Sequence, residues 1–114
     1  MSRPPAPSTI VHTVARLFGL DAADVMTRKR SRAIYDAKAA ICGLARDMLP
    51  HYGYPDIAKL VVGRHSAHAT VYGAERRWAA ASMQHRFSNG MTKASIIAAV
   101  NAARDCPSNW NRLP

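Results

Sequence analysis

The chain has 114 residues, of which 16 are lysine or arginine and 7 are aspartate or glutamate, so its formal net charge is +9 at pH 7. This length predicts one domain that buries a modest core. The positive charge favours a polyanionic partner, either nucleic acid or an anionic membrane surface. No apolar run approaches the roughly 20 residues that span a bilayer, and MSRPPAPST lacks the apolar region of a secretory signal. We therefore expect a basic cytoplasmic domain.

The chain is expected to begin with a disordered arm and one helix. Residues 1–7 contain three prolines and no periodic pattern. Ser8 or Thr9 can cap a first helix, and Gly19 ends it, because glycine adopts the left-handed conformation that commonly ends a helix. Its apolar residues share one face, which we expect to be buried: Ile10, Val11, Val14, Leu17 and Phe18.

A short turn and a basic segment precede the longest predicted helix. Asp21 caps the turn DAADVM, and RKRSR at 28–32 has four basic residues in five. A helix follows from about residue 33 to 49 and ends before Pro50. Gly43 in this helix indicates a close crossing with another helix. Apolar residues at three- and four-residue intervals predict its buried face: Ile34, Ala37, Ile41, Leu44 and Met48.

The stretch YPDIAKLVVGRHSAHATVYGAERRW, residues 54–78, predicts two helices joined by a tight turn. Pro55 suits the first helical position, and Gly63 suits the end of the first helix. Ser66 can cap the second helix, which is expected to continue to about His85. The expected buried residues are Ile57, Leu60 and Val61 in the first helix and Val71, Ala74 and Trp78 in the second.

The amino end of the second helix carries short polar side chains bordered by arginines, a composition that a DNA major groove accepts. One interpretation is a helix-turn-helix whose second helix enters DNA. The other is an ordinary helical hairpin with a solvated polar end. The exposed residues are His65, Ser66, His68, Ala69 and Thr70, and the arginines are Arg64, Arg76 and Arg77.

The remaining chain predicts a loop, a last helix and a tail. RFSNG is the loop, and Thr92 can cap the helix. Residues 106–114 are expected to be a tail. No segment alternates with the period of a strand. The fold class is therefore all-α, with a helix-turn-helix domain over residues 8–105 and a buried last-helix face of Ile96, Ile97, Val100 and Ala103.

The order and spacing of these segments resemble the C-terminal, origin-box-binding domain of the bacterial replication initiator DnaA, whose fold is like that of the Trp repressor. VARLFGL and DAADVMTRKRSR match its first helix and basic loop, AKAAICGLARDML its long helix, and YPDIAKLV the first helix of its helix-turn-helix. GRHSAHATVYGA is similar to the family's Gly-Arg-Asp-His-Thr-Thr-Val motif. The resemblance covers residues 8–105 and implies a DNA-binding domain.

The resemblance also implies which residues contact DNA. Arg30 matches the arginine that enters the minor groove, and Lys38 matches an arginine that contacts a phosphate. Pro55 falls where the family meets the DNA backbone. His68 and Thr70 match the residues that read base edges and thymine methyl groups. Besides these and the exposed hairpin residues, the expected DNA contacts include Arg28, Lys29 and Arg32.

Two features depart from the family pattern. Two additional residues stand between Arg64 and His68, so that Ala67 takes the place of the family's aspartate. Ala69 takes the place of its first threonine. An acceptor for a cytosine amino group and one hydroxyl are therefore missing. We expect DNA binding to be retained and the origin-box preference to be altered or relaxed.

The expected function is sequence-specific binding of double-stranded DNA by a small transcriptional regulator at the nucleoid, with a phage or mobile element as a candidate source. Regulation is preferred because the sequence contains no Gly-rich phosphate loop and no ATPase module. An origin-binding or initiation-control factor without ATPase activity is the alternative. A transcription or replication protein is a candidate partner.

Two other classes of protein are alternatives to a DNA-binding domain. A basic helical adaptor could bind a protein partner or an anionic membrane through Trp78, Trp110 and the apolar end of the last helix, although we favour DNA and no membrane as the partner. An enzyme is not expected, because no carboxylate pair, nucleophile–base arrangement or cofactor motif is present. His65 and His68 could share a face, but no second pair of suitable spacing completes a zinc site. Cys42 and Cys106 are expected to be reduced thiols, and no cofactor is expected.

Overall fold

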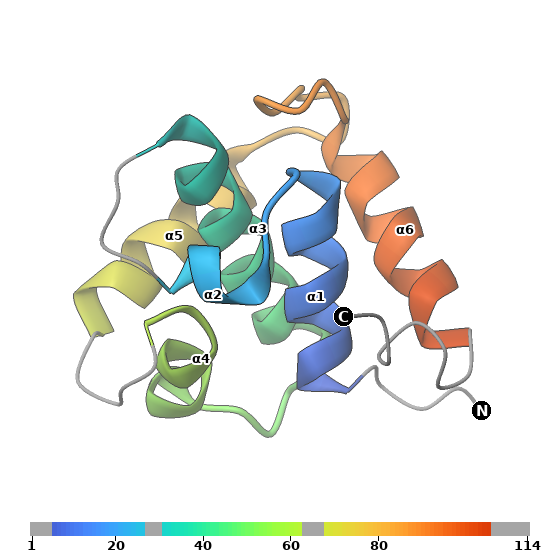
Figure 1. Cartoon of the computed structure of the whole chain (residues 1–114). Helices are drawn as coiled ribbons and strands as arrows, with labels where there is room; N and C mark the ends of the chain where they lie inside the picture. The colour runs from blue at the N-terminus through green and yellow to red at the C-terminus, as the bar shows by residue number, and fades with distance from the viewer. Residues whose placement is uncertain (1–5, 27–30, 63–67, 106–114) are drawn as a thin grey trace.

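Six helices form in the part of the chain that the computed structural model describes, residues 6–26, 31–62 and 68–105, with only the backbone described for His68, Arg104 and Asp105 (Figure 1). No β-strand occurs in these ranges, and the predicted all-α class is confirmed. The helices are α1 (Pro7–Leu17), α2 (Ala22–Val25), α3 (Arg32–Met48), α4 (Tyr54–Val61), α5 (His68–Ala80) and α6 (Lys93–Asp105).

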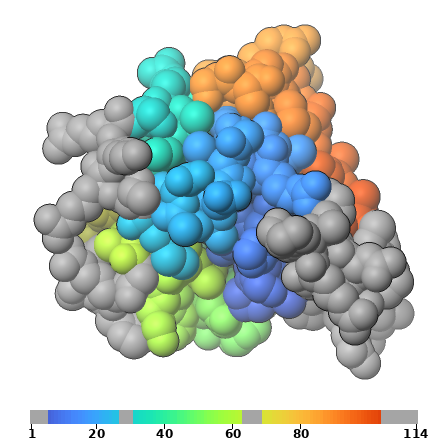
Figure 2. Space-filling view, viewed as in Figure 1, coloured from blue at the N-terminus to red at the C-terminus, as the bar shows by residue number. Residues whose placement is uncertain are grey.

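The long helix α3 packs against α1, α4 and α5, and therefore joins the two sides of the molecule. α6 packs against α1 on the side opposite α4 and α5 (Figure 1). The space-filling view shows α1 and α2 covering the middle of one face, with α4 below them and α6 at the right edge (Figure 2). α4 and α5 pack on each other, which is the helical pair that the sequence predicts.

The core consists of the faces that helical periodicity predicts. Every apolar residue expected to be buried is buried or, for Leu17, Met48, Leu60 and Ile97, partly buried at the core's edge. Cys42 is a fully buried core residue, as predicted. Its burial, with the nearby carboxylate of Glu75, raises the pKa of the thiol to about 12.

The start of α1 differs from the prediction of a Ser8 or Thr9 cap, which is wrong. Ala6 precedes the helix, and its carbonyl accepts a hydrogen bond from Thr9 N at 2.9 Å. Pro7 begins the helix because its missing N–H costs nothing in the first turn. Gly19 has a φ of 71° and ends the helix as predicted.

Side chains cap the next helices. Asp21 precedes α2 as predicted, and its N–H donates to the Asp24 carboxylate at 2.9 Å. Ser31 Oγ accepts from Ile34 N at 3.1 Å and starts α3. Pro55 is the second residue of α4, one place later than expected. Gly63 and Ser66, predicted to form the turn to α5, lie outside the described residues.

α5 ends at Ala80, so the prediction that it continues to about His85 is wrong. Lys93 Nζ donates to the carbonyls of Trp78 at 2.9 Å and Ala81 at 3.1 Å, which satisfies the carboxyl end of α5. The carbonyls of Met83 and His85 accept from the first N–H groups of α6. Residues 81–85 therefore lie outside α5, and two of their carbonyl groups bind the amino end of α6.

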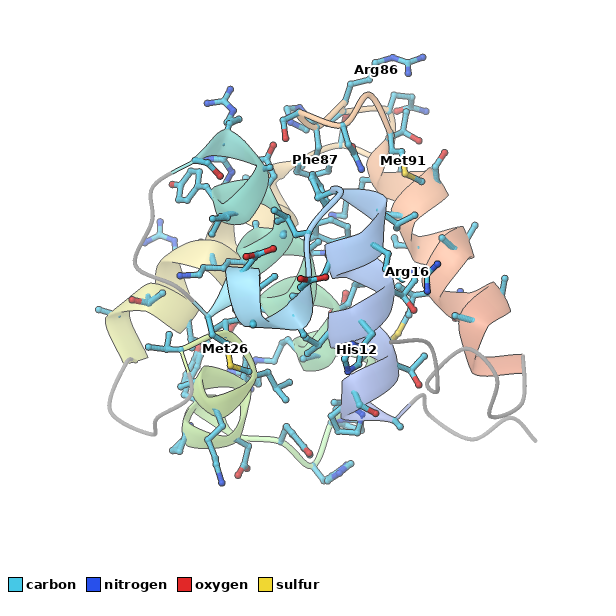
Figure 3. All side chains as sticks on the ribbon, in the orientation of Figure 1. His12, Arg16, Met26, Arg86, Phe87 and Met91 are labelled. Atoms are coloured by element: carbon cyan, nitrogen blue, oxygen red, sulfur yellow. The ribbon has the colours of Figure 1, made fainter. Side chains whose placement is uncertain are left out.

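The predicted loop and cap after this segment are confirmed. In the loop, Phe87 points into the fold and Arg86 points away from it (Figure 3). The Phe87 ring stacks on Trp78 with centroids 5.5 Å apart. Thr92 Oγ1 accepts from Ser95 N at 3.1 Å and caps α6.

α3 and α5 cross in direct contact at Gly43, as predicted. A Cβ added at Gly43 would overlap the side chain of Trp78, which is 2% exposed. Because the overlap involves the Trp78 Cβ as well as the ring, a rotation of the indole alone could not relieve it. The absence of a side chain at Gly43 therefore sets how closely the two helices approach.

A buried carboxylate joins α3, α5 and the loop before α6. Asp36 is 1% exposed, and its oxygens accept from Arg77 Nη2 at 2.6 Å and from Ser88 N at 2.9 Å. The Arg77 guanidinium also lies 3.9 Å from the centroid of the Tyr35 ring. Both oxygens of the buried charge thus have a donor, as burial of a carboxylate requires.

Gly43→Ala is expected to destabilise the domain by about 1–3 kcal/mol, because the added methyl group forces α3 and α5 apart. The free energy of unfolding is measured by urea titration. Gly73→Ala is the matched control, since a Cβ at Gly73 meets nothing within 4 Å, and it should stabilise α5 by about 1 kcal/mol. Equal effects of the two substitutions would show that the crossing is not tight.

Asp36→Asn is expected to lower the free energy of unfolding by about 2 kcal/mol, because it leaves Arg77 without its counter-charge. This loss is smaller than that expected when one partner of a fully buried ion pair is removed, about 3–5 kcal/mol, because the Arg77 side chain is 28% exposed. Thermal unfolding monitored by circular dichroism gives the comparison. Asp47→Asn removes the same charge at an exposed position of α3 and should have little effect.

Candidate nucleic-acid interface

α5 has one buried face and one exposed face along its whole length. Val71, Ala74 and Trp78 are buried, which confirms the predicted core positions. Most residues between them project outward because a helix turns 100° per residue, whereas Glu75 and Arg77 are partly buried at the two flanks of the helix. Among the described side chains of α5 that precede its last turn, the exposed ones are Ala69, Thr70, Tyr72, Gly73 and Arg76.

The structure describes about half of the predicted DNA contacts. Arg32, Pro55, Ala69, Thr70 and Arg76 are exposed, and Lys38 is half-buried. His68 is the first residue of α5, but its side chain is not described. The remaining predicted contacts lie outside the described residues: Arg28, Lys29, Arg30, Arg64, His65 and Ser66.

Arg77 belongs to the fold as well as to the surface. Its guanidinium is held between the buried carboxylate of Asp36 and the ring of Tyr35. Asp36 lies 41 residues earlier in the chain, so the sequence pattern alone gave no sign of the pairing. Arg77 therefore fixes one flank of α5 on α3.

A second basic surface borders the opposite flank of α5, and the prediction from sequence missed most of it. We call it the aromatic–arginine cluster: Arg46, Tyr54, Tyr72 and Arg76. The guanidinium carbon of Arg46 lies 4.4 Å from the Tyr54 centroid, and that of Arg76 lies 5.4 Å from the Tyr72 centroid. The two tyrosine rings meet edge to face with centroids 6.2 Å apart. The i, i+4 spacing of Tyr72 and Arg76 is the sequence feature that could have indicated their contact.

Glu75 links the Arg46 side chain of this cluster to α5. Its Oε1 accepts from Arg46 Nε at 3.2 Å, and this hydrogen bond raises the pKa of the Arg46 guanidinium. Arg46 thus bridges α3, α4 and α5. Tyr72 is 51% exposed and Arg76 is exposed, so this part of the cluster is accessible to a partner.

The outward groups suit a nucleic acid chemically. A guanidinium such as that of Arg76 binds phosphate oxygens through paired N–H donors. Thr70 offers a hydroxyl to a base edge and a methyl group to a thymine. The exposed ring of Tyr72 can pack on sugars or bases. Thr70 in the first turn of α5, Tyr72 in the second and Arg76 in the third are therefore exposed groups of the kinds that nucleic acids contact.

The described part of the chain has neither a metal-binding cluster nor a membrane-spanning helix. Among the described residues, no three His, Cys, Asp or Glu side chains come together as they would to hold a metal ion. His65 lies outside these residues, so the histidine pair weighed from the sequence is not tested. No helix within the described ranges is long and apolar enough to cross a membrane.

Comparison with known proteins identifies the family. Neither the curated proteins nor the solved structures gave a match. The family model of the bacterial DnaA protein helix-turn-helix matches residues 7–77, which is more than half of the chain. The match begins at the first residue of α1 and ends within α5 at Arg77, so it includes all of α4 and most of α5. The chain therefore belongs to the bacterial DnaA helix-turn-helix family.

Proposed function

We propose that this protein binds double-stranded DNA at specific sequences and acts as a small transcriptional regulator in the cytoplasm, at the nucleoid. The observation that carries the proposal is the family match across α4 and most of α5, where Ala69 and Thr70 in the first turn of α5 are exposed. The net charge of +9 supports a polyanionic partner.

In the proposed complex, the amino end of α5 enters the major groove. His68 and Thr70 read base edges there, and Arg76 contacts a phosphate on the border of the groove. The exposed Pro55, in the first turn of α4, lies against the DNA backbone. The basic residues at 28–32 reach the neighbouring minor groove, where an arginine responds to groove width.

Regulation is favoured over origin binding because the groups that would read an origin box are changed. Ala69 stands where the resemblance expects a threonine, and Ala67 where it expects an aspartate. Origin binding or control of initiation, without ATPase activity, is the second candidate. Genome-wide mapping of bound sites separates the two, since a regulator should occupy promoters and an origin factor should cluster at the replication origin.

The double substitution His68→Ala with Thr70→Ala should remove the preference between sites and leave the fold intact. Each lost base contact should cost about 1–3 kcal/mol on the preferred site and much less on random DNA. Competition binding against a randomised duplex pool gives the measurement. Selection of the same sites at the same ratios by the double variant would refute the placement of the recognition helix.

The salt dependence of binding tests the electrostatic contacts. Phosphate contacts from five residues, Arg30, Lys38, Arg64, Arg76 and Arg77, predict a slope of about −4 to −5 for the logarithm of the association constant against the logarithm of salt concentration. Arg76→Ala should reduce its magnitude by about one. Arg86→Ala is the control, because Arg86 lies on the loop before α6 and donates to Gly90 O there. A slope near zero for the wild-type protein would contradict phosphate binding.

A further inference from the structure

The two glycines inside described helices occupy opposite environments. Gly43 is buried against Trp78, so the packing of α3 on α5 explains it. Gly73 lies in the middle of α5, is exposed, and would place a Cβ with nothing within 4 Å. Its φ is not positive, since the positive-φ glycines are Gly19 and Gly90. Neither packing nor backbone conformation therefore accounts for glycine at position 73.

Glycine at such a position weakens the helix. After proline it is the least favourable residue in a helix interior, because it loses the most backbone freedom on folding. Alanine would fit the same backbone and the same open space without that loss. Glycine also permits close approach of a ligand to the backbone, so a contact with a partner outside the folded chain would give the bare α5 backbone at Gly73 a physical role.

The position of Gly73 indicates where that contact lies. Gly73 follows Ala69 by four residues, so both lie on the outward face one turn apart. Helical geometry places the Tyr72 and Arg76 pair on one flank of Gly73 and Thr70 on the other. The pair is held by its cation–π contact of 5.4 Å. Gly73 is thus a gap between the phosphate-binding and base-reading side chains of the proposed interface.

We propose that the edge of a base pair in the major groove comes into van der Waals contact with the α5 backbone at Gly73, which makes Gly73 a specificity-determining position. This inference rests on the proposed function. With no side chain at Gly73, α5 sits deeper in the groove, and the Cα–H group can contact a base acceptor directly. The deeper position brings Thr70 to the bases.

Gly73→Ala in the full chain tests the inference because stability and binding should change in opposite directions. The unfolding temperature should rise by about 4 °C, as expected for a helix-favouring substitution in a small domain. Affinity for the duplex preferred by the wild-type protein should fall about tenfold, within the range for one lost groove contact. Affinity for a randomised duplex should change little. Ala98→Val adds bulk to an exposed face of α6 and is the control expected to leave both affinities unchanged.

Three results would overturn the inference. Unchanged affinity for the preferred duplex would show that nothing approaches Gly73. A lower unfolding temperature would show that the fold itself requires the glycine. An equal loss on both duplexes would point to a backbone contact in place of a base contact. The affinities of the wild-type protein for the two duplexes are measured before those of the variant. If the wild-type protein does not distinguish the two duplexes, the proposed function itself fails.

Discussion

The rotational setting of α5 on α3 decides which side chains of α5 can meet a partner. Three contacts around the helix fix it: Trp78 lies against Gly43 beneath α5, Arg77 pairs with Asp36 on one flank, and Glu75 bonds Arg46 on the other. A rotation of α5 would break at least one of these contacts and bury one of the outward residues. The outward face is therefore a consequence of the α3–α5 packing.

The side chains that make these three contacts are not spread evenly along α5. Glu75, Arg77 and Trp78 all lie in its carboxyl half, whereas in the amino half Val71 is the fully buried side chain. Substitutions at the exposed Ala69 and Thr70 in the first turn therefore have little effect on packing. This explains how the chain can carry Ala69 where the resemblance expects threonine and keep the same helical architecture. Base preference can change in such an arrangement without a matching loss of stability.

Periodicity predicted the buried faces well because spacing along a helix is a local property. Ile41, Leu44 and Trp78, for example, are buried at the positions that the helical spacing of apolar residues predicts. The end of α5 was not predictable in this way, because it depends on Lys93, which reaches back from the next helix to two carbonyls. The role of Arg77 was likewise not predictable, because it depends on pairing with Asp36, which lies 41 residues earlier in the chain. The predicted contacts at 28–30 and 64–66 lie outside the described residues and stay predictions.

The family match ends at Arg77, but the folded unit continues beyond it. Ser88 N donates to the buried Asp36 of α3, and the side-chain amide of Asn89 donates to the Leu17 carbonyl of α1 at 3.0 Å. Lys93 completes the end of α5, and α6 covers α1. The segment after Arg77 therefore contacts each of the three longest matched helices. Because the Asp36 carboxylate binds both Arg77 and this segment, the setting of α5 depends on residues that lie outside the matched region.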